Sequence, residues 1–80
     1  MKNIFSLRLT ELIRESGKTQ NKISSEFKIT KQKLSNWKVG FTEPNLDDLM
    51  MIATYFGVST DYLLGLEDDA GGKPKTDSKT

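Results

Sequence analysis

Apolar residues recur along most of the chain at the three- to four-residue spacing of amphipathic helices. In the first segment, the stripe at positions i, i+4, i+7 and i+8 consists of Phe5, Leu9, Leu12 and Ile13. Gly17 follows, and glycine can end a helix because it adopts the left-handed conformation without strain. The pattern therefore predicts a first helix from Asn3 to Ser16.

Two short capped helices are expected next. Thr19 and Thr30 each precede an apolar segment, and a threonine hydroxyl can accept a hydrogen bond from a first-turn backbone N–H. The inward faces consist of Ile23 and Phe27 in one helix and of Leu34 and Trp37 in the other. Two such helices joined by about three residues have the geometry of a helix-turn-helix, which would run from Thr19 to Gly40.

A fourth helix is predicted after Pro44, which disfavours helical backbone at the residue before it. Asn45 can cap this helix, with Asp48 three residues on as in a capping box. Its apolar face is expected to comprise Leu46, Leu49, Ile52, Ala53 and Phe56. Gly57 would end it.

A last short helix is predicted from Thr60 to Leu64, with Ser59 as its cap. Leu63 and Leu64 are expected to pack on the other helices before Gly65 ends it. Residues 1–66 are thus predicted to form one all-α domain, a compact five-helix bundle. Residues 67–80 are rich in Gly, Lys, Asp, Ser and Thr and are expected to be a disordered tail or the start of a linker.

The composition excludes several classes of chemistry. The sequence of 80 residues contains no cysteine and no histidine, so disulfides, thiolate nucleophiles, imidazole bases and the usual zinc sites are absent. It also has no phosphate-binding glycine loop, so no catalytic residue, metal, cofactor or small-molecule ligand is expected. No apolar run approaches the ~20 residues of a membrane span, and Met1 to Phe5 is too short and polar for a signal peptide, so a cytoplasmic protein is expected.

The net charge is only +1, but the charges are distributed unevenly. A basic region between residues 18 and 38 contains Lys18, Lys22, Lys28, Lys31, Lys33 and Lys38. Glu26 is the lone acid there, whereas residues 39–69 carry only acidic charges. The basic region is therefore suited to a polyanionic partner.

Candidate DNA contacts lie on the outward side of the helix-turn-helix. Lys31, Gln32 and Asn36 are the candidates for base contacts, because they can reach one groove and their side chains can bond adenine or guanine. Helix N-termini bind anions, which favours phosphate contacts at the start of the second helix. The phosphate candidates are Thr19, Gln20, Lys22, Lys33, Lys38 and Thr42.

A longer set of positions forms a family pattern: Thr19-Gln20-Asn21-Lys22-Ile23-Ser24-Ser25-Glu26-Phe27-Lys28-Ile29-Thr30, then Leu34-Ser35-Asn36-Trp37, Gly40, Pro44, Leu49, Ile52-Ala53 and Gly57-Val58-Ser59-Thr60-Asp61-Tyr62-Leu63-Leu64-Gly65. With these residues the chain resembles the Cro and phage-repressor helix-turn-helix family, also called XRE. The resemblance covers about Phe5 to Leu66. It implies a five-helix, lambda-repressor-like domain that binds pseudo-palindromic operators as a homodimer. It also implies that Gln20 contacts phosphate and that residues 31, 32 and 36 contact bases.

Four residues depart from the family pattern. Lys28 stands where the family favours glycine, which predicts a positive φ at a cost of about 1 kcal/mol. Ile13 and Lys38 stand where many members pair an arginine with a glutamate, so Lys38 is expected to be free to add positive charge near the DNA. Lys18 replaces a usual leucine and is expected to expose its ammonium group while its stem covers the apolar gap.

Several residues have alternative interpretations. Trp37 could stack on a DNA sugar or phosphate edge, but Leu34 on the same face favours a core position. Asp47 and Asp48 could form a metal or acid/base site, but negative charge is favoured in the first turn of a helix, so a structural role is expected. The candidates for a dimer interface are Met51, Tyr55, Tyr62 and Leu66, with ordinary partly exposed side chains as the alternative.

These features favour a transcriptional regulator, expected to be a repressor, that binds double-stranded DNA as a homodimer. Residues 30–38 would occupy the major groove. The alternative is a protein-interaction module, such as an antitoxin or anti-regulator, with the acidic C-terminal half as its interface. An enzyme is not expected.

Overall fold

The computed structural model describes residues 3–66, which contain five helices. The helices are α1 (Ile4–Ser16), α2 (Gln20–Phe27), α3 (Lys31–Val39), α4 (Leu46–Phe56) and α5 (Thr60–Leu64). No strand occurs in this range, so the predicted all-α, five-helix architecture is confirmed. The expected tail, residues 67–80, lies outside the described residues.

Side-chain caps set the start of every helix. A first-turn backbone N–H donates in each case to the side chain of the N-cap residue: Asn3, Thr19, Thr30, Asn45 or Ser59. Asn3 is therefore the cap of α1 rather than its first residue, and Ser6 completes a capping box with it. Each cap contributes about 1 kcal/mol to stability, which matters because helices this short are marginal alone.

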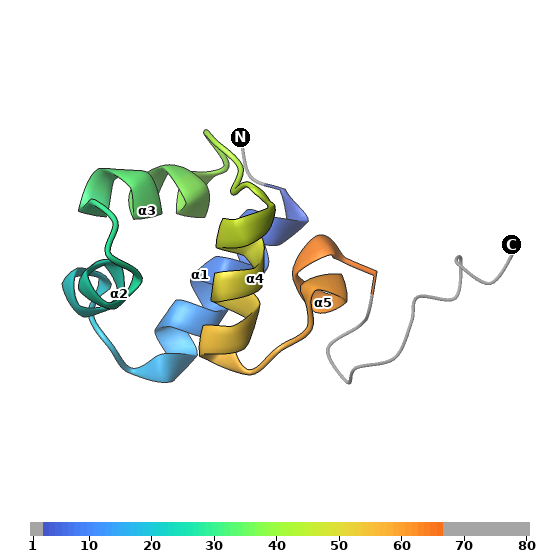
Figure 1. The fold of residues 1–80 in the computed structure, drawn as a ribbon, viewed down its shortest axis with the longest axis horizontal. Coiled ribbons are helices and arrows are strands. Elements are labelled where there is room, and N and C mark those ends of the chain that lie inside the picture. The colour runs from blue at the N-terminus through green and yellow to red at the C-terminus, as the bar shows by residue number, and fades with distance from the viewer. Residues whose placement is uncertain (1–2, 67–80) are drawn as a thin grey trace, which may run out of the picture.

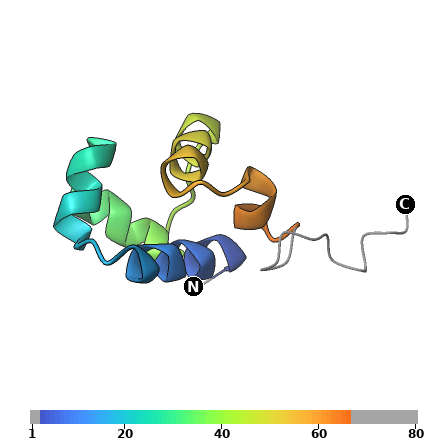
Figure 2. The same cartoon turned by 90° about the horizontal axis from the view of Figure 1, so that it is seen from below.

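The arrangement of the helices places α2 and α3 together at one end of the molecule. The packed pairs include α1 with α3, α1 with α5, α2 with α3 and α4 with α5. Figure 1 shows α2 and α3 on one side, α5 on the other, and α4 crossing α1 between them. Seen after a quarter turn, α1 and α4 lie in separate layers (Figure 2).

Every helix contributes one fully buried aliphatic side chain to a single core. These are Leu9, Ile23, Leu34, Ile52 and Leu63, each with 0% of its surface exposed. Trp37 is also buried, at 1% exposed, so the core interpretation of this residue is confirmed.

None of the helices in residues 3–66 combines the length and the apolar character that a membrane span requires.

Two leucines expected in the core lie at the surface instead. Leu46 is 78% exposed because it is the first residue of α4, at the edge of the apolar stripe and one turn before Leu49. Leu64 is 47% exposed, whereas its neighbour Leu63 is buried. Successive helical residues point about 100° apart, so this single turn of helix buries only one of the two.

Candidate nucleic-acid interface

The turn between α2 and α3 is closed by a left-handed residue. Lys28 has a φ of 61°, which confirms the positive φ predicted from its place in the family pattern. Its N–H donates to the carbonyl oxygen of Ser25, and the N–H of Ile29 donates to that of Ser24. These bonds satisfy the last carbonyls of α2 and direct the chain into Thr30, the cap of α3.

The outward face of α3 carries polar side chains. Lys31 and Gln32 are exposed and Asn36 is partly buried. The Gln32 side-chain Nε2 donates to Asn36 Oδ1 at 2.9 Å, as the i, i+4 spacing allows. Paired amides offer both donors and acceptors, which is the chemistry that bonds the major-groove edge of adenine. The structure therefore pairs two of the three residues singled out for base contacts, and the third, Lys31, is exposed one position before Gln32.

The N-terminus of α2 combines backbone donors with a glutamine side chain. Thr19 Oγ1 accepts from the N–H of Lys22 at 3.1 Å. The N–H groups of Gln20 and Asn21 have no acceptor within the helix, because no helical carbonyl group precedes them. Lys38, in the last turn of α3, donates from Nζ to Gln20 Oε1 at 2.9 Å. Two residues predicted to contact phosphate are thus bonded to each other.

The arginine–glutamate pair of the family is replaced by two unrelated contacts. Ile13 is buried in the core at 6% exposed, so position 13 supplies no charge to this site. The ammonium group of Lys38 is bonded to the neutral amide of Gln20, so it has a partner but keeps its positive charge, and its contribution to charge near the DNA stays a prediction. The physical reason is that a partly buried ammonium group needs an acceptor, and the amide oxygen of Gln20 is within reach.

Lys33 is directed toward α4. Its Nζ lies 3.6 Å from Asp48 Oδ2 and 5.5 Å from the centroid of the Trp37 ring. Asp48 donates its backbone N–H to Asn45 Oδ1, but its carboxylate faces Lys33. The expected capping box is therefore replaced by an ion pair between α3 and α4.

Residues 3–66 contain no group of three histidine, cysteine or acidic residues that could hold a metal ion.

Thr42, the remaining phosphate candidate, lies exposed in the loop after α3. Its N–H donates to the carbonyl oxygen of Asn36 at 3.4 Å. The hydroxyl is therefore carried on a segment anchored to the end of α3.

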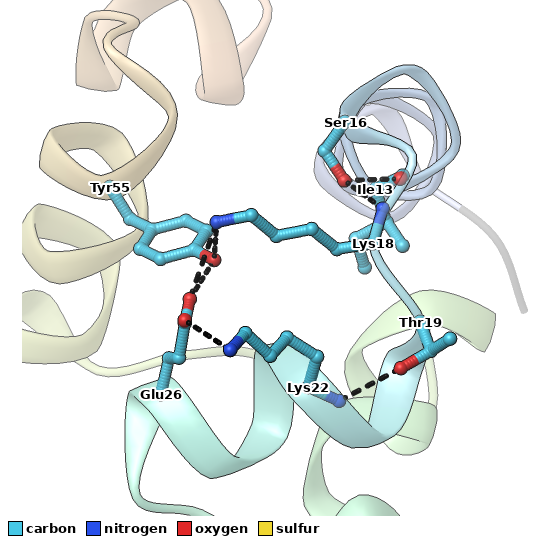
Figure 3. Close-up of polar contacts among 7 residues, drawn as sticks. All are labelled: Ile13, Ser16, Lys18, Thr19, Lys22, Glu26 and Tyr55. Atoms are coloured by element: carbon cyan, nitrogen blue, oxygen red, sulfur yellow. Dashed lines mark hydrogen bonds and ion pairs between the residues drawn. The ribbon is translucent and has the colours of Figure 1, made fainter.

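A polar cluster of Lys18, Lys22, Glu26 and Tyr55, here called the tyrosine cluster, joins the start of the helix-turn-helix to α4 (Figure 3). The Tyr55 hydroxyl donates to Glu26 and accepts from Lys18 Nζ at 2.8 Å. Glu26 also lies 3.4 Å from Lys18 Nζ and 3.5 Å from Lys22 Nζ. The ammonium group of Lys22, a predicted phosphate contact, is therefore held beside a carboxylate.

The tyrosine cluster changes the titration of two residues. The hydrogen bond from Tyr55, followed by the bond and charge of Lys18 and the bond from Lys22, lowers the pKa of Glu26. The hydrogen bond to Tyr55, followed by Glu26, raises the pKa of Lys18 above its usual value. The i, i+4 spacing of Lys22 and Glu26 could have revealed part of this cluster in the sequence. The part played by Tyr55 has no sequence signal, because it lies 37 residues from Lys18.

The dimer candidates differ in their surroundings. Tyr55 packs edge-on against Phe27, with ring centroids 4.9 Å apart, and the Arg8 guanidinium lies 4.2 Å from the Tyr62 ring centroid. Met51 is partly buried, and Leu66 is 49% exposed. The most exposed large apolar residues outside this set are Phe41, Leu46 and Met50, none of which was predicted to lie at an interface.

Two short capped helices joined by a left-handed turn, with a polar outer face on the second, define the helix-turn-helix class of proteins. Residues 7–69 match the family model described as a helix-turn-helix domain, and the chain belongs to this family.

The chain is similar to three regulators of Bacillus subtilis (strain 168). It is 36% identical over 70 residues to the HTH-type transcriptional regulator ImmR, and the aligned residues cover 88% of this chain and 54% of that protein. It is 30% identical over 76 residues to the uncharacterized HTH-type transcriptional regulator YobD, covering 95% of this chain and 66% of that protein. It is 33% identical over 61 residues to the SPbeta prophage-derived uncharacterized HTH-type transcriptional regulator YonR, covering 76% and 56%. The chain thus spans between about half and two thirds of the length of these relatives.

Proposed function

We propose that this protein binds double-stranded DNA sequence-specifically and regulates transcription as a repressor, with α3 in the major groove. The observation that carries the proposal is the paired amide face of Gln32 and Asn36 on the exposed side of a helix whose other side is buried through Leu34 and Trp37. The names of the three relatives support the same function.

The base contacts and the phosphate contacts belong to different elements. Lys31, Gln32 and Asn36 contact base edges from α3, where each good bidentate pair contributes about 1–3 kcal/mol of discrimination. The phosphate contacts come from the residues around them: Thr19, Gln20, Lys22, Lys33 and Thr42 would contact phosphates directly, and Lys38 would take part through its bond to Gln20. Such contacts hold the protein in register and make its affinity depend on salt.

The proposed assembly is a homodimer on a pseudo-palindromic operator. Each copy would place α3 in successive major grooves about 34 Å apart. The dimer contact would use the last two helices, with Met51, Tyr55, Tyr62 and Leu66 as its candidates. Leu64, the last residue of α5, and Leu66, two residues later, are half exposed and support this position. Residues 1–66 would be the DNA-binding domain of a cytoplasmic, non-enzymatic protein.

Selection of bound sequences from a random duplex pool at about 150 mM salt tests the proposal. The parent protein is compared with a variant carrying Lys31→Ala, Gln32→Ala and Asn36→Ala. The matched control carries Glu11→Ala, Arg14→Ala and Glu15→Ala, three exposed residues of α1. We expect the parent and the control to enrich the same inverted repeat and the α3 variant to lose it.

Loss of enrichment in the α1 control but not in the α3 variant would place the reading surface elsewhere. A pool with no enriched sequence for any of the proteins would overturn the proposed function. The interaction-module alternative would then be favoured, because Phe41, Leu46 and Met50 expose apolar surface in the acidic half of the chain.

A further inference from the structure

The contact between Lys38 and Gln20 joins the two ends of the helix-turn-helix. Gln20 is the first residue of α2 and Lys38 lies in the last turn of α3, 18 residues later. Their hydrogen bond is 2.9 Å long and partly buried. It is therefore a contact between helices at the position where Gln20 is proposed to meet a phosphate.

The chemistry of the two side chains determines which atom of the amide faces which way. An ammonium group has three donors and no acceptor, so its partner in Gln20 must be the carbonyl oxygen and not the nitrogen. Oε1 and Nε2 diverge from the same carbon, so an oxygen held by Lys38 leaves the NH₂ group directed away from it. A phosphate oxygen accepts only, and it can bond the NH₂ group but not the carbonyl oxygen.

We propose that Lys38 is a positioning residue, which orients the Gln20 amide so that its NH₂ group donates to a DNA phosphate. This inference rests on the proposed function, because it concerns a contact made during DNA binding. Lys38 then acts through Gln20 and not by its own contact with the backbone. A carboxylate at position 38 would bond the nitrogen instead and turn the carbonyl oxygen toward the phosphate.

The proposal explains why a lysine is suited to position 38 in this chain. Ile13 is apolar and buried, so position 13 supplies no cation that an acidic residue at position 38 could pair with. Gln20 Oε1 is then the acceptor that position 38 meets, and a lysine can donate to it.

The first test needs no DNA. The side-chain amide resonances of Gln20 are assigned by NMR in the parent, in Lys38→Met, which keeps the apolar stem, and in Lys38→Arg, which keeps a donor. We expect the Gln20 NH₂ resonances to shift in Lys38→Met and to return toward the parent positions in Lys38→Arg. Unchanged resonances in Lys38→Met, with the rest of the spectrum folded, would overturn the proposal.

The second test measures affinity for a random-sequence duplex, because phosphate contacts do not depend on sequence. We expect Lys38→Met and Gln20→Ala each to weaken binding by about tenfold, which corresponds to about 1.4 kcal/mol. The double variant should bind no more weakly than either single variant, since both remove the same contact. Lys38→Glu should weaken binding further than Lys38→Met.

Additive losses of DNA affinity in the double variant would overturn the proposal. A second contradicting result would be a dependence of affinity on salt that is weaker by about one unit when Lys38→Met is added to Gln20→Ala. Either result would show a direct contact from Lys38 to a phosphate. Failure of the parent to bind any duplex would instead refute the proposed function, and the NMR result would still decide how Gln20 is oriented.

Gln20→Glu provides a variant that keeps a partner for Lys38 but lacks the NH₂ group. It should therefore lose DNA affinity without loss of stability.

Discussion

At the scale of single residues, Lys28 carries the backbone strain of the helix-turn-helix. It is the only non-glycine residue with positive φ in the described part of the chain, where α1, α3, α4 and α5 each end in glycine. A side chain with a Cβ atom is strained in this conformation by about 1 kcal/mol. The turn therefore forms at some cost to stability, although its backbone hydrogen bonds are made.

Replacing Lys28 with glycine should raise the free energy of unfolding by about 1 kcal/mol, because it removes this strain. Lys28→Ala is the matched control, since it removes the same charge but keeps the Cβ atom. Urea unfolding of the three proteins checks the prediction. Equal stabilisation by both substitutions would show that the charge, and not the backbone conformation, carries the cost.

At the scale of elements, the tyrosine cluster connects α2 to α4, whereas the ion pair of Lys33 with Asp48 connects α3 to α4. Glu26 of α2 accepts a hydrogen bond from the Tyr55 hydroxyl of α4. Lys18, in the segment before α2, donates to the same hydroxyl and forms an ion pair with Glu26. These side chains are well solvated, so each contact is individually weak. Together they restrain the orientation of the helix that carries the proposed phosphate contacts.

The cluster predicts a dependence of stability on pH. The pKa of Glu26 is lower in the folded protein, so its contribution to stability is complete above the usual value of 4.5 and is lost as the pH falls through the folded value. Glu26→Gln should therefore be less stable than the parent at pH near 7, and the difference should narrow as the pH is lowered below about 4.5. Urea unfolding across this range measures it.

Two further variants complete this test. Tyr55→Phe removes the largest cause of the lowered pKa and should weaken the same acid dependence. Glu11→Gln changes an exposed glutamate of α1 and is the control for loss of one negative charge. If the free energy of unfolding of Glu26→Gln stays below that of the parent by a constant amount down to pH near 3, the predicted link between stability and protonation of Glu26 is contradicted.

At the scale of the whole molecule, all five helices share one core, so none of them is an independent folding unit. α3 is held from within by Leu34 and Trp37, and the same core contains Ile52 of α4 and Leu63 of α5. Local damage far from the interface should therefore destabilise the surface that carries the proposed DNA contacts.

Ile52→Ala should lower the free energy of unfolding by about 2–5 kcal/mol, a large part of the ~5–15 kcal/mol available to a small domain. Met50→Ala on the same helix is the control, because Met50 is 61% exposed and its loss should cost within about 0.5 kcal/mol. The fluorescence of Trp37, the one tryptophan of the chain, reports unfolding. Similar losses for the two variants would show that α4 is not part of the shared core.

Sequence alone determined where the helices begin and end, because caps and helix-ending residues act on backbone groups within one or two turns. Thr19, Thr30 and Gly57 therefore have the predicted roles. The same locality made the pairing of Gln32 with Asn36 accessible, since i, i+4 neighbours meet on any helix.

Only the tertiary structure decided the contacts between elements, which depend on how the helices are oriented around the core. Lys38 meets Gln20 across 18 residues and Tyr55 meets Glu26 across 29, and no periodicity relates positions so far apart. For the same reason Leu46 matches the apolar pattern of α4 and is nevertheless exposed, because burial requires a neighbouring element at that point of the helix. Local chemistry thus set the elements, and packing set which side chains remain available for a partner.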